Sequence, residues 1–175
     1  MLSRMLRAAR SARRRQSPLL LRSATRADVP LILQLVRELA TYERAPDAVV
    51  ATEADFLRDG FGHSPRFQVL LAEWNGEPAG FALYFYSWST WLGRKGLYLE
   101  DLFVREPLRG NGIGKSLLVE LARIAVREGC GRFQWQVLDW NEPALGFYRS
   151  LGAEVMSEWL TARIEGQALV QLAKE

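Results

Sequence analysis

The sequence predicts an α+β fold in which helices flank a mixed, mostly antiparallel sheet, within one domain of residues 18–175. Short apolar runs alternate with helical periods along the chain. Two of these runs flank the dipeptide Asn75-Gly76, a strong hairpin signal, and a glycine-rich loop joins a third run to a helix. The 175 residues are 49% hydrophobic and 25% charged. This composition excludes disordered and fibrous classes and suits a single packed core.

Each predicted helix begins near a polar residue or a glycine that suits a helix start. Thr25 (with Asp28), Thr52 and Asn141 have side chains that accept hydrogen bonds from the first turn. The glycine-rich loop precedes the remaining helix. The predicted helices are about 28–42, 53–58, 112–128 and 142–151.

The apolar runs between the helices are predicted strands. Ser87–Gly96, rich in Trp and Gly, is expected to be a connection, and the last two strands are expected to meet at Glu165-Gly166. The predicted strands are Leu19–Leu21, Phe67–Trp74, Ala79–Tyr86, Leu97–Val104, Phe133–Leu138, Val155–Thr161 and Ala168–Leu172.

Basic residues are concentrated at the N-terminus. Six of the 23 Lys and Arg residues, and none of the 20 Asp and Glu residues, lie in residues 1–17, which leaves 17 basic against 20 acidic residues. A mildly acidic domain is a poor nucleic-acid binder but suits a cationic substrate. The segment 1–17 resembles a mitochondrial transit peptide; its other readings are a disordered extension and a start codon assigned too early. We therefore expect a cytoplasmic protein, with the mitochondrial matrix as the alternative.

Several classes of site and partner are not supported by the sequence. With one cysteine, Cys130, and one histidine, His63, the chain has neither a disulfide framework nor a His/Cys metal cluster, so we expect no metal. Because no apolar run approaches the roughly 20 residues that span a bilayer, we expect no membrane partner.

The glycine-rich loop has the features of a pyrophosphate site. Gly110, Gly112 and Gly114 alternate at the start of a helix, where backbone amides and the helix dipole favour anions. Arg109 and Lys115 add positive charge. A P-loop would need a glycine where Arg109 stands, and the dinucleotide fingerprint fails at its last glycine. The pattern Arg/Gln-x-x-Gly-x-Gly/Ala fits residues 109–114.

That pattern resembles the acetyl-CoA-binding motif of the GNAT superfamily of N-acetyltransferases. Further segments are similar to its spermidine/spermine (diamine) and thialysine acetyltransferase group. They are Glu38–Glu43, Asp59–Gly62, Tyr98–Val104, Leu138–Pro143 and Gly146–Ala153. The resemblance covers about Leu20 to the C-terminus and implies a GNAT domain, acetyl-CoA as co-substrate and a homodimer.

The same resemblance implies where the ligands bind. The strands 97–104 and 133–138 are expected to splay apart, with pantetheine between them. The expected cofactor-binding residues are Leu102, Phe103, Val104, Arg109, Gly110, Asn111, Gly112, Ile113, Gly114, Lys115, Asn141, Glu142, Pro143 and Ala144. The expected amine-site residues are Tyr42, Glu43, Glu100, Gln134, Trp135 and Gln136.

Acetyl transfer to an amine needs a group that takes the ammonium proton and a group that protonates the leaving thiolate. Glu100 is the candidate base, acting directly or through water. Asp101 should point to the opposite face of the strand, so we favour Glu100. Tyr148 is the candidate acid.

The sequence leaves the acceptor open. Arg44 follows Glu43, and Ser157-Glu158-Trp159 is shorter than the polyamine group's counterpart, so a polyamine is less strongly indicated than acetyl transfer itself. A small primary amine, such as a polyamine, a diamine or thialysine, is the leading acceptor. The alternatives are a protein or peptide amine, and a non-catalytic acyl-CoA sensor.

Overall fold

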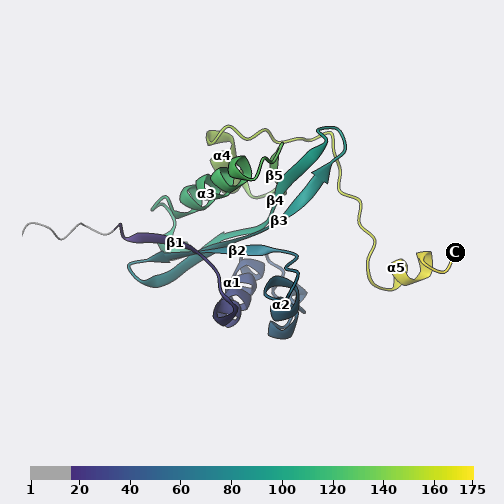
Figure 1. Cartoon of the computed structure of the whole chain (residues 1–175), viewed down its shortest axis with the longest axis horizontal. Coiled ribbons are helices and arrows are strands. Elements are labelled where there is room, and N and C mark those ends of the chain that lie inside the picture. Colours follow the sequence, from purple (N-terminus) through teal and green to yellow (C-terminus); the bar gives the residue numbers. More distant parts are fainter. Residues whose placement is uncertain (1–16) are drawn as a thin grey trace, which may run out of the picture. The chain divides into compact units, whose positions relative to one another are not determined.

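A five-stranded sheet in the order β1-β2-β3-β4-β5 forms the centre of residues 17–136 in the computed structural model, which describes residues 17–175 (Figure 1). Neighbouring strands are antiparallel except β4 and β5, which are parallel. The predicted mixed, mostly antiparallel sheet is therefore confirmed. The strands are β1 Leu19–Ser23, β2 Gln68–Trp74, β3 Glu77–Ser89, β4 Arg94–Val104 and β5 Phe133–Trp135.

Three helices of this unit cover the two faces of the sheet. Figure 1 shows α1 (Val29–Tyr42) and α2 (Glu53–Gly60) on one face and α3 (Ile113–Arg127) on the other. As predicted, Thr25 and Asp28 form a capping box, on a short 3-10 turn that leads into α1. None of the helices among residues 17–175 has the length and apolarity to cross a membrane.

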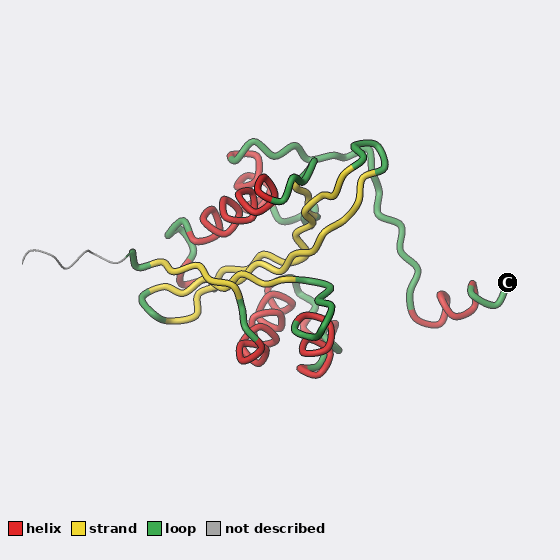
Figure 2. The backbone as a smooth tube through the Cα atoms, viewed as in Figure 1, coloured by secondary structure: helices red, strands yellow, loops and turns green. Residues whose placement is uncertain are grey.

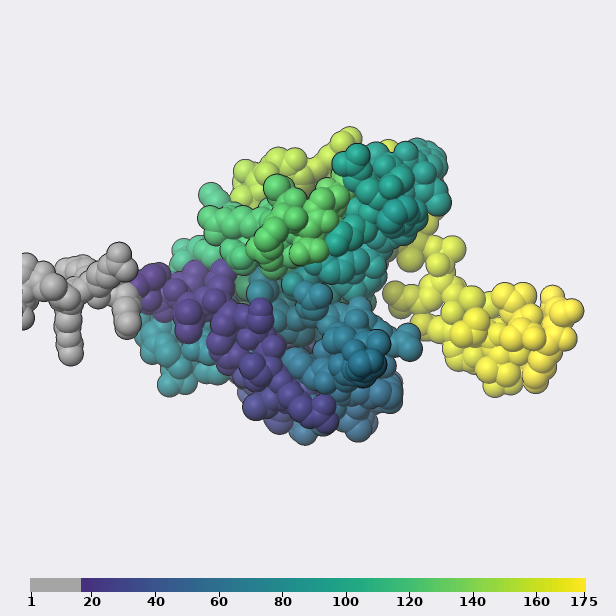
Figure 3. All heavy atoms as spheres, viewed as in Figure 1, coloured from purple at the N-terminus to yellow at the C-terminus, as the bar shows by residue number. Residues whose placement is uncertain are grey.

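The main core lies between the sheet and the helices α1 and α2. Ile32 and Leu35 of α1 are fully buried, as are Leu71 of β2 and Phe81 of β3. The helical period of α1 and the alternation of β2 and β3 thus bring their apolar sides together. In Figure 3, atoms of α1 (purple) adjoin those of α2 (blue).

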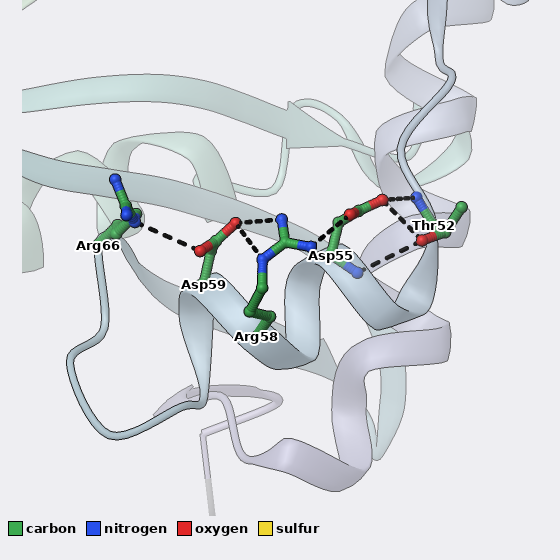
Figure 4. A network of polar contacts seen from close by, with 5 residues as sticks. All are labelled: Thr52, Asp55, Arg58, Asp59 and Arg66. Atoms are coloured by element: carbon green, nitrogen blue, oxygen red, sulfur yellow. Dashed lines mark hydrogen bonds and ion pairs between the residues drawn. The ribbon is translucent and has the colours of Figure 1, made fainter.

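A polar network fixes both ends of α2 (Figure 4). At its start, Thr52 and Asp55 exchange hydrogen bonds, with the Asp55 amide donating to the Thr52 hydroxyl at 3.3 Å. Arg58 then links Asp55, at 2.9 Å, to Asp59, which also pairs with Arg66 from the following loop at 3.3 Å. These side chains are largely exposed, so we assign the network an ordering role and little stability.

A bulge interrupts the pairing of β3 with β4. Leu83 lies opposite Asp101 and Tyr84 lies opposite Leu99, which leaves Glu100 as the extra residue. Because directly opposite residues share a face, Asp101 lies on the α1 face with Leu83, and Leu99 lies on the other face. The bulge interrupts the strict alternation on which the choice of Glu100 over Asp101 depends.

The predicted splaying of two strands is present in the sheet. β5 pairs with β4 only at Leu97, Tyr98 and Leu99, whereas β4 continues to Val104. The five residues after Leu99, Glu100–Val104, thus lack a strand partner on the β5 side. The predicted strand Phe133–Leu138 is correspondingly shorter, because pairing ends at Trp135.

The β3–β4 connection is also shorter than predicted. β3 continues to Ser89 and β4 begins at Arg94, so Ser87–Gly96 is mostly strand rather than loop. The Trp- and Gly-rich composition obscured this, because cross-strand pairing outweighs local preference.

Residues 137–175 form a second compact unit. Its helix α4 (Glu142–Ser150) is capped by Asn141, whose side chain accepts from the Ala144 amide at 3.3 Å. The predicted strands Val155–Thr161 and Ala168–Leu172 are wrong: Figure 2 shows a loop followed by the helix α5 (Gly166–Leu172). Residues 154–175 are exposed throughout, so their apolar alternation has no neighbouring strand to pair with.

The prediction for the basic segment 1–17 lies outside the described residues, apart from Ser17. The single-domain boundary 18–175 remains a prediction.

Candidate active site

The loop between β4 and α3 is shaped by two glycines with positive φ. Gly110 has φ 82° and Gly112, the residue that precedes α3, has φ 75°. A Cβ atom at either position would meet nothing within 4 Å, so the requirement for glycine comes from the backbone conformation. Asn111 steadies the loop, because its side-chain amide donates to the Leu108 carbonyl oxygen at 3.0 Å.

The amides of this loop are available to an anion. In the described chain, no backbone hydrogen bond outside the regular elements uses an amide of residues 110–115. The first amides of α3 also have no partner within the helix. Several amides at a helix N-terminus suit a pyrophosphate, and Lys115 is exposed beside them. The residues present therefore fit the predicted binding of the CoA pyrophosphate.

Arg109, expected to bind the cofactor, makes side-chain contacts within the protein. Its Nε donates to the Val104 carbonyl oxygen at 3.0 Å, and its guanidinium lies 4.3 Å from the centroid of the Tyr42 ring. Phe103 lies further off, at 5.9 Å. The structure thus brings Tyr42, expected at the amine site, to the residue that opens the phosphate loop.

The charges of two carboxylates act on a third, Asp101, beside the unpaired part of β4. Burial, together with the negative charges of Glu100 and Glu43, raises the pKa of Asp101 to about 7. Desolvation also raises the pKa of Glu43, which follows the last residue of α1. Such repulsion is relieved when a cation binds among the acids. Among the described residues, no group of His, Cys, Asp and Glu is arranged to hold a metal ion.

Asp101 is the functional candidate that the sequence reasoning did not select. Strand alternation predicts that only one of the adjacent acids reaches a pocket and favours Glu100, which is exposed in the structure. The bulge and the raised pKa of Asp101 show that both acids belong to one electrostatic region. A carboxylate adjacent to the matched motif was the available signal, but a bulge cannot be inferred from the alternation of residue types.

The remaining β4 and β5 candidates lie where pairing ends. Leu102, Phe103 and Val104 belong to the part of β4 without a β5 partner. On β5, Gln134 lies opposite Tyr98 and Trp135 lies opposite Leu99. The end of β5 is therefore next to the bulge at Glu100, as the predicted amine-site border requires.

The second unit holds the other candidates. Glu142, Pro143 and Ala144 form the first turn of α4, after the buried Asn141. Tyr148 is buried on the same helix as Leu145, and its ring lies 5.4 Å from that of Phe147. A buried tyrosine fits both a packing role and a proton donor, so Tyr148 stays a prediction.

Comparisons with known proteins agree with this geometry. Residues 32–153 match the acetyltransferase (GNAT) family. The chain is 41% identical to the thialysine N-epsilon-acetyltransferase of Sus scrofa over 165 residues, which cover 88% of this chain and 96% of that protein. It is 34% identical to the L-ornithine N5-acetyltransferase of Arabidopsis thaliana, covering 88% of this chain and 87% of that one.

Solved structures show the same fold. An integron cassette protein from the mobile metagenome of V. cholerae superposes with a TM-score of 0.78 at 29% identity, covering 91% of this chain and all of the other. The splayed strands, the glycine loop at the start of α3 and the sequence matches lead to one conclusion. This chain belongs to the GNAT family of acetyltransferases.

Proposed function

We propose that this N-acetyltransferase transfers the acetyl group of acetyl-CoA to a primary amine of a small molecule. The observation that carries the proposal is the cluster of Glu43, Glu100 and Asp101 beside the unpaired part of β4. A short carbon chain bearing an ammonium group would neutralise this negative charge. The relatives are named for thialysine, ornithine and spermidine/spermine acetylation, and all of these acceptors carry primary amines.

Binding of the cofactor is assigned to the residues that the sequence predicted. Acetyl-CoA supplies the acetyl group as a thioester. The amides of residues 110–115, together with Lys115, hold its pyrophosphate, and the free edge at Leu102–Val104 hydrogen-bonds the pantetheine arm. The first turn of α4, from Asn141 to Ala144, lines the cofactor. Backbone amides of a splayed strand also suit the developing charge on the carbonyl oxygen.

Proton transfer is assigned to side chains. Glu100, the base expected from the sequence, takes the proton of the ammonium group directly or through water. Asp101 is a second candidate, because a general base works best when its pKa lies near the working pH and the pKa of Asp101 is about 7. Tyr148 protonates the leaving thiolate. Tyr42, Gln134, Trp135 and Gln136 border the amine, and the homodimer implied by the resemblance remains part of the proposal.

The test is a thiol-release assay with acetyl-CoA against a panel of acceptors. Thialysine, ornithine, lysine, putrescine and spermidine represent small amines, and lysine-containing peptides represent protein acceptors. We expect turnover with at least one small amine and little with peptides. Turnover confined to peptides would replace the proposal with protein acetylation. CoA binding without any turnover would indicate a sensor.

A further inference from the structure

Two side-chain contacts join the last turns of α1 to the segment that opens the phosphate loop. Arg105 forms a bidentate ion pair with Glu38, with its Nε 2.9 Å from Oε2 and its Nη2 2.8 Å from Oε1. One turn further along α1, the ring of Tyr42 lies 4.3 Å from the guanidinium of Arg109. Glu38 and Tyr42 are four residues apart and therefore share one face of the helix.

The first contact is a fixed support. Arg105 directly follows β4, and its Nη1 also donates to the Pro78 carbonyl oxygen at 2.9 Å, which ties α1 to β3 as well. Gln34 donates to Glu38 at 2.9 Å on the helix side. With both partners about one quarter to one third exposed and several bonds in one network, this pair has the geometry in which a surface ion pair holds its place.

The second contact lies at the start of the loop. Arg109 is exposed and directly precedes Gly110. Both Gly110 and Gly112 have positive φ. Its side chain is located by the bond to the Val104 carbonyl oxygen and by its position over the rings of Tyr42 and, further off, Phe103. Phosphate bound at the amides of residues 110–115 would immobilise this loop and, with it, Arg109.

We infer that Arg109 and Tyr42 are positioning residues that couple cofactor binding to the amine site. When the loop closes on the pyrophosphate, the guanidinium of Arg109 fixes the Tyr42 ring and thereby the end of α1, where Glu43 follows. The carboxylate of Glu43 is then fixed in position to bind the ammonium group before the amine binds. The inference rests on the proposed placement of the amine site at Glu43.

The coupling has a calculable size. A cation–π contact at an exposed site changes an equilibrium by about two- to fivefold. Removing the Tyr42 ring should therefore weaken binding of the amine by about that factor. The effect should appear in the KM for the amine more than in kcat. The phosphate contacts themselves remain, so CoA affinity should change less than the amine KM.

Hydrogen exchange on the full chain tests the inference without turnover. CoA alone, at saturating concentration, should slow amide exchange over residues 39–44 in the wild type and in Tyr42→Phe, which keeps the ring. Tyr42→Leu should lose that protection. Arg109→Gln, also at saturating CoA, removes the cationic partner of the same contact and should lose the protection too. The inference therefore remains testable if one of the two variants folds poorly. Equal protection in all four proteins, or none in the wild type, would overturn the inference.

A separate variant distinguishes this inference from the proposed function. If Glu43→Gln leaves the amine KM unchanged, the amine site is not at Glu43 and its proposed placement fails. If Glu43→Gln raises that KM while Tyr42→Leu keeps both the exchange protection and the wild-type KM, only the coupling through Arg109 and Tyr42 fails.

Discussion

Replacing Asp101 by Asn should make the protein more stable at pH 8 than the wild type. The Asp101 carboxyl keeps its proton up to a pKa of about 7 in the folded state, against 3.8 in its ordinary surroundings. Between these values the folded state binds one more proton than the unfolded chain. The free energy of unfolding therefore falls as the pH rises through this window, and the loss is complete above pH 7. Asn is uncharged at every pH and has nearly the same shape.

The magnitude follows from the two pKa values. Three pKa units correspond to about 4 kcal/mol in total, at 1.36 kcal/mol per unit. Between pH 5 and the pKa of about 7 the pH rises by about two units, so the free energy of unfolding of the wild type should fall by about 3 kcal/mol from pH 5 to pH 8. Asp28 and Glu38 do not confuse the measurement, because arginine partners lower the pKa of each and their contributions are lost only at more acidic pH.

The measurement is urea unfolding followed by tryptophan fluorescence at pH 5, 6.5 and 8. Asp101→Asn should show a much flatter profile, exceeding the wild type by about 1–2 kcal/mol at pH 5 and by about 4 kcal/mol at pH 8. Glu100→Gln is the matched control: it removes the second-largest cause of the raised pKa and should reduce the slope only in part. An Asp101→Asn profile as steep as that of the wild type would show that Asp101 is already ionised at neutral pH, and would remove it as a candidate base.

Two further predictions concern the cofactor and the acid. Gly112→Val forces a β-branched residue to φ 75° and should weaken CoA binding at least several-fold in calorimetry. The control Gly76→Val, which places the same strain in the β2–β3 turn, should leave CoA binding unchanged. Unchanged CoA affinity in Gly112→Val would remove the loop from the site. Tyr148→Phe keeps the ring and loses the hydroxyl, so kcat should fall by about 10²–10⁴-fold with CoA affinity nearly unchanged. Near-wild-type turnover would exclude Tyr148 as the acid.

Local signals predicted much of this structure correctly. The start of α2 at Thr52 and that of α4 at Asn141 depend on side chains within one turn of the helix, and both caps are present. The Asn75-Gly76 turn and the glycine that precedes α3 depend on backbone conformations that few residues adopt, and both glycines have positive φ. Such features are encoded in a few neighbouring residues, so sequence reasoning finds them.

Features that depend on distant partners were predicted poorly. The strands expected at 155–161 and 168–172 needed a neighbouring strand, and residues 166–172 form a helix instead. The length of β5 is set by where its pairing with β4 ends, not by its own apolar run. The position of Asp101 depends on β3, because the bulge exists only relative to Leu83 and Tyr84. Pairing register is not visible within the strand itself.

The bulge at Glu100 lies between the proposed cofactor site and the proposed amine site. Without it, Leu97, Leu99 and Asp101 would lie on one face of β4, and the carboxyl would lie among the apolar residues beneath α3. With it, Leu97 and Leu99 keep the α3 face, opposite Tyr86 and Tyr84, while Asp101 turns to the face of α1 and the charge of Glu43. β5 pairs with β4 only before the same point. One extra residue thus lies where the pairing with β5 ends and turns Asp101 to the α1 face, so the proposed pantetheine gap and the proposed amine site adjoin at Glu100.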